Sequence, residues 1–119
     1  MKVIRMPENG VNFVPYEVEG TMISFGDEEI MMNLKKKEKD DDVTVDVCRD
    51  YLGGLTFSTG GADTYVAQIH IPARKYTDTQ TSNPDYNPED PASPENITER
   101  RPVPFSMKNV TLTLYEEVR

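Results

Sequence analysis

The chain of 119 residues is long enough for one hydrophobic core and too short for two, so we expect a single domain spanning residues 1–119. No window holds the roughly 18 consecutive apolar residues that a membrane-spanning helix requires, and the first 20 positions lack the apolar run of a signal peptide. We therefore expect a protein that is not embedded in a membrane and not exported by the usual route.

The formal net charge of -8 is concentrated in one segment. From Thr77 to Glu99 there are six acidic residues and no basic residue, so this segment carries -6. The rest of the chain holds 15 acidic and 13 basic residues and is nearly neutral. Because binding to phosphate groups needs clustered Lys and Arg, we expect no direct contact with nucleic acid.

Alternation of apolar and polar residues is the dominant pattern, and its period of two is typical of β-strands. In chain order, the predicted strands cover residues 2–6, 13–19, 21–25, 30–34, 43–49, 65–71 and 110–115. Pro7 and Pro15 interrupt the early strands, and a proline lacks the backbone donor that a ladder needs. The strands near the start are therefore expected at an edge, a bulge or an end.

Turn signals separate these strands, at Asn9-Gly10, Gly26-Asp27, Gly53-Gly54 and Gly60-Gly61. The stretch Ser58–Asp63 lacks the lysine of a phosphate-binding loop and is interpreted as a hairpin turn. Residues 35–42 form a block of positive and then negative charge, which we expect to be a solvated hairpin connection. Short strands at this spacing predict an all-β fold, a single antiparallel β-sandwich or barrel-like domain.

One long segment between two predicted strands has a different composition. Residues 83–96, NPDYNPEDPASPEN, contain four prolines and four carboxylates. Low hydrophobicity and net negative charge do not support a packed core, and loops longer than about 15 residues tend to be functional or disordered. The prediction is one long Pro-rich acidic loop over residues 77–101. Within it, Ser93-Pro94-Glu95 resembles a helix start, which allows one helical turn through Glu99.

Few residues are candidates for chemistry. His70 is the only histidine, so any nucleophilic dyad would have to use it as the base. It is expected on the polar face of its strand beside Gln68, a position typical of a surface role. Cys48, the only cysteine, also falls on a polar face and is expected to be partly exposed. No pair among the 21 acids is singled out, so we expect no enzyme, no cofactor, no metal site and no small-molecule substrate.

The acidic segment is the candidate partner-binding site. A mobile acidic tether with a few apolar anchors is typical of segments that become ordered on binding. The alternative is an inert insertion, since surface loops lengthen at small thermodynamic cost. The candidate residues are Tyr76, Asp78, Asp85, Tyr86, Glu89, Asp90, Glu95, Ile97 and Glu99.

Three stretches in the second half carry a resemblance to other proteins: YVAQIHIPARKY from Tyr65, PVPF from Pro102 and VTLTLY from Val110. Together they resemble small uncharacterised proteins of tailed phages and prophages. The resemblance includes no catalytic motif. It implies the bacterial cytoplasm or a virion as the setting.

Two functional hypotheses follow. The first is a noncatalytic protein-interaction module, an accessory or structural protein of phage or prophage virion assembly, which contacts a protein partner or self-associates through sheet edges. The alternative is an acidic inhibitor of a host nucleic-acid-binding machine, whose negative segment mimics nucleic acid.

Overall fold

The computed structural model describes residues 1–57 and 64–117, so the turn predicted over residues 58–63 lies outside the described residues. The chain divides into two compact units. The unit before Arg74 and after Pro104 is called the body below. The second unit, Arg74–Pro104, is called the hairpin. Each unit is described by itself.

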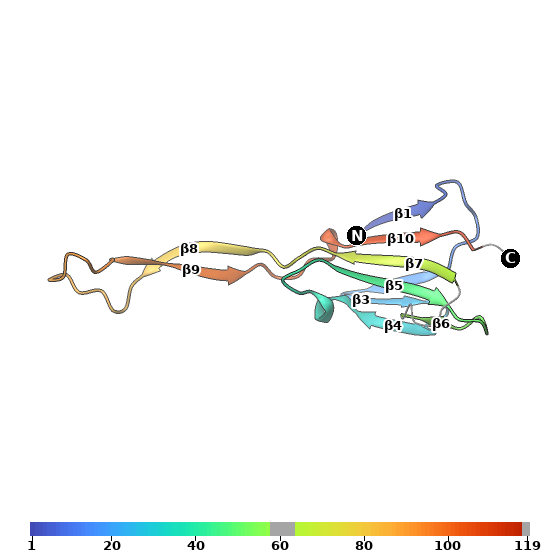
Figure 1. Cartoon of the computed structure of the whole chain (residues 1–119), viewed down its shortest axis with the longest axis horizontal. Coiled ribbons are helices and arrows are strands. Elements are labelled where there is room, and N and C mark those ends of the chain that lie inside the picture. Colours follow the sequence, from blue (N-terminus) through green and yellow to red (C-terminus); the bar gives the residue numbers. More distant parts are fainter. Residues whose placement is uncertain (58–63, 118–119) are drawn as a thin grey trace. The chain divides into compact units, whose positions relative to one another are not determined.

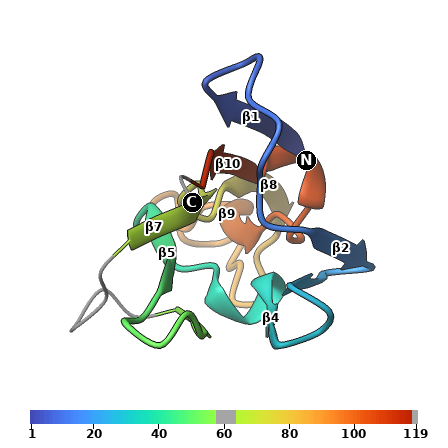
Figure 2. The same cartoon turned by 90° about the vertical axis from the view of Figure 1, so that its right-hand side faces the viewer.

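The body contains two β-sheets, and Figure 2 shows β1, β10, β7 and β5 in succession on one side with β2 and β4 on the other. The larger sheet has the order β1-β10-β7-β5-β6 and the smaller sheet the order β2-β3-β4. The strands of the larger sheet are β1 (Lys2–Met6), β10 (Thr111–Tyr115), β7 (Thr64–Ile71), β5 (Val43–Arg49) and β6 (Leu55–Thr56). Those of the smaller sheet are β2 (Tyr16–Glu19), β3 (Met22–Phe25) and β4 (Ile30–Asn33).

Both sheets contribute to one hydrophobic core. Ile23 and Phe25 of β3 are fully buried, as are Leu112 and Leu114 of β10, and in both strands the residue between them is partly exposed. This is the burial pattern that the period-two alternation predicted. Burying each such side chain contributes about 1.5–3 kcal/mol. The all-β fold with antiparallel sheets is therefore confirmed.

One pair of strands is parallel, which the prediction did not include. β1 runs parallel to β10, with Lys2 beside Thr111 and Met6 beside Tyr115. The two strands come from opposite ends of the chain, so the body itself supplies the long connection that parallel strands require. β10 in turn runs antiparallel to β7.

The charged block over residues 35–42 does not connect a hairpin, so that prediction is wrong. β4 belongs to the smaller sheet and β5 to the larger one, and the block crosses between them. It begins in the short 3-10 helix η1 (Leu34–Lys37), where the Asn33 side chain accepts a hydrogen bond from the Lys35 N–H. Leu34 is fully buried and anchors this crossover in the core. A second 3-10 helix, η2 (Met107–Asn109), precedes β10.

The hairpin consists of two antiparallel strands, β8 (Tyr76–Ser82) and β9 (Asn96–Pro102), labelled in Figure 1. The prediction of a loop without strands over residues 77–101 is therefore wrong, as is the helical turn through Glu99. Threonines alternate along β8, and threonine favours strands. Both faces of this hairpin are polar, however, so the apolar alternation by which we recognised the other strands is missing.

Candidate functional site

The candidate partner-binding residues lie in the hairpin, whose strands are in continuous register from Tyr76 opposite Pro102 to Ser82 opposite Asn96. Backbone hydrogen bonds extend this ladder at both ends. The Val103 N–H donates to the Lys75 carbonyl at 2.8 Å, and the Asn83 N–H donates to the Glu95 carbonyl at 2.9 Å. The segment is thus paired along its length up to the tip, residues 83–95.

Side chains reinforce the ladder with cross-strand contacts. Asp78 stands opposite Arg100, which is a favourable charge pair. The Gln80 amide donates to the Thr98 hydroxyl at 2.8 Å. The Arg100 guanidinium lies 4.0 Å from the centre of the Tyr76 ring, a cation–π contact. Tyr76 therefore already has an interaction within the hairpin and is less suited to be an apolar anchor.

Within β9, Arg101 pairs with Glu99, with 2.9 Å between Arg101 Nη2 and Glu99 Oε2. The hydrogen bond that Arg101 donates to the Glu99 carboxylate, together with the negative charge of that carboxylate, raises the pKa of Arg101. Both side chains remain largely exposed, so the pair orients two surface groups and adds little stability.

The tip of the hairpin is built from turns, and the first begins at Asn83. The Asn83 side-chain oxygen accepts from the Asp85 N–H at 2.9 Å, and the Asn83 carbonyl accepts from the Tyr86 N–H at 3.1 Å. Pro84 occupies the second position, where its restricted φ suits a turn. This pair of bonds is an Asx turn within a β-turn.

The same pattern occurs twice more. The Asn87 side-chain oxygen accepts from the N–H of the second residue after it, and the Asn87 carbonyl accepts from the N–H of the third, with Pro88 in between. Asp90 and Pro91 form the same arrangement. The Ser93 hydroxyl closes the series by accepting from the Asn87 N–H at 2.9 Å. Three Asx-Pro turns in succession therefore give the tip a defined backbone without a hydrophobic core.

These turns explain the proline-rich composition of residues 83–96. In each turn an Asn or Asp supplies the side-chain acceptor and the following proline fixes φ. Asn-Pro and Asp-Pro pairs are known turn signals, and this sequence contains three of them between two threonine-rich or charged strands. That signal could have identified the hairpin from the sequence.

Charge is separated along the hairpin. The tip holds Asp85, Glu89, Asp90 and Glu95 and no basic residue. The opposite end holds the basic residues Arg74, Lys75, Arg100 and Arg101. The hairpin is therefore acidic at its tip and basic at its base, which the count over residues 77–99 did not reveal.

The structure does not bring all the candidate residues together into one patch. Tyr76 and Asp78 alternate with Thr77 and so share one face, while Ile97 and Glu99 project from the other face. The remaining candidates belong to the tip: Asp85, Tyr86, Glu89, Asp90 and Glu95. Tyr86 is 41% exposed and Ile97 40% exposed. The hairpin thus offers two exposed faces and a tip rather than a single pocket.

The neighbours of His70 are two threonines on the adjacent strands and the carboxylate of Asp42. His70 is placed between Thr44 and Thr111 in the sheet register, and its Nε2 lies 3.4 Å from Asp42 Oδ2. The other carboxylate oxygen of Asp42 accepts from the Ala73 N–H at 2.7 Å. That backbone bond, followed by the contact with His70, lowers the pKa of Asp42. These contacts hold the end of the crossover against β7.

Cys48 is fully buried, so the expectation of a partly exposed thiol is wrong. The register between β5 and β7 shifts at Val47 and Cys48, which marks a β-bulge or irregularity. Val47 and Cys48 are consecutive and both buried, so the alternation of the sequence breaks at this point. Burial, followed by the negative charge of Asp46, raises the pKa of the thiol, so the thiol is poorly suited to react as a nucleophile.

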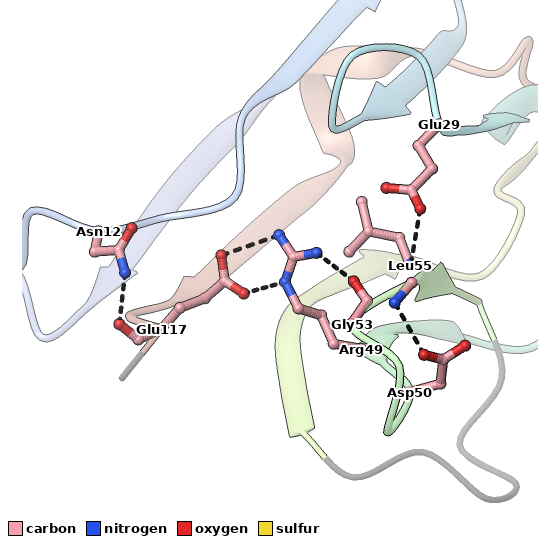
Figure 3. Close-up of polar contacts among 8 residues, drawn as sticks. Asn12, Glu29, Arg49, Asp50, Gly53, Leu55 and Glu117 are labelled. Carbon is pink, nitrogen blue, oxygen red and sulfur yellow. Dashed lines mark hydrogen bonds and ion pairs between the residues drawn. The ribbon is translucent and has the colours of Figure 1, made fainter. Parts of the chain in front are cut away.

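An ion pair of the body, shown in Figure 3, was not predicted from the sequence. Glu117 has a side chain only 7% exposed, and its two carboxylate oxygens bond Arg49 Nε and Nη2. Arg49 Nη1 also donates to the Gly53 carbonyl at 2.8 Å. The Glu117 carboxylate raises the pKa of Arg49. The pair ties β5, the turn after it and the segment after β10 together, and it is a structural contact.

A groove of about 610 Å³ on the larger sheet is lined by Asp46, Thr64, Tyr65, Gln68 and Tyr115. Two of its polar groups satisfy each other, because the Gln68 amide donates to the Asp46 carboxylate at 3.0 Å. Within residues 1–57 and 64–117, no group of three or more His, Cys, Asp or Glu residues is placed to hold a metal ion.

No family model matches this chain, and neither the curated proteins nor the solved structures include a significant match. Among the described residues, no helix has the length and apolar character needed to cross a membrane.

Proposed function

We propose that this protein is a noncatalytic protein-interaction module, in which the hairpin Arg74–Pro104 is the element that contacts the partner. The observation that carries the proposal is a two-stranded, polar hairpin that forms a compact unit of its own. The residues of β8 and β9 are exposed, apart from Tyr76, Thr81 and Glu99, which are partly exposed. With the resemblance described above, the proposed role is an accessory or structural component of a phage particle, in the bacterial cytoplasm or the virion.

The ordered turns of the tip favour a binding role for the hairpin. An isolated two-stranded hairpin is only marginally stable in water, because it buries little apolar surface. Here the Asx-Pro turns restrict the unbound conformations of the tip, which lowers the entropy lost on binding. A preorganised strand pair can then add to a partner's sheet through its backbone groups, which is a common mode of peptide recognition.

The test is to excise the hairpin and measure binding. Replacing Arg74–Pro104 with Gly-Ser-Gly is expected to preserve the body, because β7 and β10 remain antiparallel neighbours that a short connection can join. Proteins that co-purify with the tagged wild type from producing cells are identified by mass spectrometry. The purified partner is then titrated with both forms by calorimetry.

We expect the excised protein to keep the thermal midpoint of the body and to lose at least about tenfold in affinity for that partner. Equal affinity of the two forms would show that the hairpin is not the contact element. Turnover of a substrate by the purified protein would contradict the noncatalytic part of the proposal.

A second candidate function is inhibition of a basic, nucleic-acid-binding protein. Four acidic residues in a tip without basic residues favour it, since they are held on ordered turns rather than on a free tether. Association would then weaken steeply with salt. Changing the four acids to their amides (D85N, E89Q, D90N and E95Q) keeps the side-chain acceptor of the Asp90 turn. Unchanged binding by this variant at low salt would exclude the inhibitor function.

A further inference from the structure

We propose that the hairpin binds a second copy of this chain, and that the two copies pair antiparallel through the free edge of β8 about a two-fold axis. This inference rests on the proposed function of the hairpin as an interaction element and names its partner. Its support comes from the ladder geometry, the prolines and the charge separation of the hairpin.

The ladder geometry shows which residues of β8 face outward. Lys75 pairs with Val103 and Asn83 with Glu95 through backbone bonds at the two ends of the hairpin. Because bonded and non-bonded pairs alternate in an antiparallel ladder, the odd-numbered residues of β8 bond to β9. Asp78, Gln80 and Ser82 therefore direct their backbone N–H and C=O groups away from β9. Among the strands that the structure describes, β8 pairs with β9 alone.

The outer edge of β9 is less suited to pairing. By the same alternation, its outward residues are Asn96, Thr98, Arg100 and Pro102. Pro102 has no N–H group to donate, and prolines are a known means of blocking sheet edges. The edge of β8 contains no proline from Tyr76 to Ser82. The outer edge of β9 therefore lacks one backbone donor, at Pro102, whereas the outer edge of β8 lacks none.

One register of antiparallel self-pairing satisfies both the backbone and the charges. Centring the two-fold axis on Thr79 places Asp78 opposite Gln80 of the second copy, so that a carboxylate faces an amide. Moving the centre to Asp78 would set two carboxylates directly opposite each other, which is destabilising. The Thr79-centred register also pairs the full length of β8.

The same register matches the separated charges of the hairpin. It places Lys75 of each copy opposite Asn83 of the other copy, next to Asp85. The basic end of one hairpin then lies along the acidic tip of the other, and the two-fold axis repeats this contact. A parallel arrangement would set tip against tip and base against base. Charge complementarity therefore favours the antiparallel pair.

Cysteine scanning tests the register directly. In the proposed pair Thr79 opposes Thr79 of the second copy in a non-hydrogen-bonded site, where Cα atoms lie about 4.5 Å apart and a disulfide can form. The variant Thr79→Cys is expected to give a disulfide-linked dimer under mild oxidation. The matched control Thr81→Cys, two residues along the same face, is expected to stay unlinked by itself. It should form a disulfide when mixed with Thr77→Cys, its partner in this register.

Proline substitution tests which edge is used. Gln80→Pro removes an outward N–H of β8, and Thr98→Pro removes one from the directly opposite site on β9. Both variants lose the same Gln80–Thr98 side-chain bond, so they are closely matched. We expect Gln80→Pro to raise the dimer dissociation constant at least about tenfold in light scattering and sedimentation. Thr98→Pro is expected to leave it within about twofold.

The outcomes separate this inference from the proposed function. A wild-type protein that is monomeric at every accessible concentration, or equal linking of the residue-79 and residue-81 variants, would overturn self-pairing through β8. Hairpin-dependent binding of a different protein would leave the interaction module standing. Circular dichroism of each variant checks that the body remains folded. A dimer that forms equally well without residues 74–104 would overturn self-pairing through β8, whereas the interaction module is refuted only by equal partner affinity with and without the hairpin.

Discussion

The contact of Glu117 with Arg49 leads to a quantitative prediction for the variant Glu117→Gln. Glu117 is 7% and Arg49 24% exposed in their side chains, and two guanidinium nitrogens bond the carboxylate. The amide keeps the volume of the side chain but removes the charge and one of the two acceptors.

The expected loss follows from the strength of these bonds. Hydrogen bonds to charged groups contribute about 1.5–3 kcal/mol each, and removing one partner of a fully buried pair costs about 3–5 kcal/mol. Because Arg49 is about a quarter exposed and keeps its bond to Gly53, water compensates in part. We expect a loss of about 2 kcal/mol in the free energy of unfolding. With about 2.1 cal/mol/K of unfolding entropy per residue, this lowers the thermal midpoint by about 8 °C.

Thermal unfolding by circular dichroism and urea unfolding at neutral pH both measure this loss. The control is Glu99→Gln, which removes the exposed carboxylate that pairs with Arg101. Surface pairs contribute little, so no measurable shift is expected for the control. A shift of less than about 2 °C for Glu117→Gln would refute the argument, because the buried pair would then be equivalent to a surface pair.

Three further predictions concern the body. The Cys48 thiol, buried and with a raised pKa, should react with a thiol reagent many times more slowly in the native protein than in urea, and equal rates would contradict its burial. The pKa of Asp42 is lowered from its ordinary value of 3.8, so its contacts stabilise the fold above that pH and lose this effect as the pH falls through the lower native pKa. Asp42→Asn should therefore reduce the acid sensitivity of urea unfolding below about pH 4, whereas an unchanged pH profile would contradict the linkage. Gly26 has φ +70°, and a Cβ there would meet Leu55 Cδ1 at 3.1 Å, while Gly20 has φ +61° and open space. Both changes to alanine should destabilise by about 1 kcal/mol from φ alone, and urea unfolding should show the larger loss for Gly26→Ala.

Most strands of the body were predictable because their side-chain pattern is local. The strands predicted over residues 2–6 and 43–49 match β1 and β5, and those over residues 65–71 and 110–115 match β7 and β10 to within one residue. In β5, β7 and β10 apolar residues alternate because one face contributes to the core, while β1 contributes Val3. The short strand β6 was missed, since two residues are too few to show a period.

The hairpin was missed for the opposite reason. β8 reads YTDTQTS, and neither of its faces is buried, so no apolar alternation marks it. Its stability comes from cross-strand pairs and from the Asx-Pro turns, and only the turns have a signal in the sequence. The polar and acidic character of this segment was evident from the sequence, while the separation of its candidate residues into two faces, an acidic tip and a basic base was not.

By itself, the sequence determined the all-β character, most strand positions and the place of the polar excursion, because alternation and turn residues act over a few neighbouring positions. Tertiary structure alone decided that β1 lies parallel to β10, that the register shift buries Cys48, and that Arg49 meets Glu117 across 68 positions of chain. These features depend on which distant strands pair and in what register. Many registers satisfy the same local pattern, and the one adopted is selected by packing of the shared core and by compensation of buried charge.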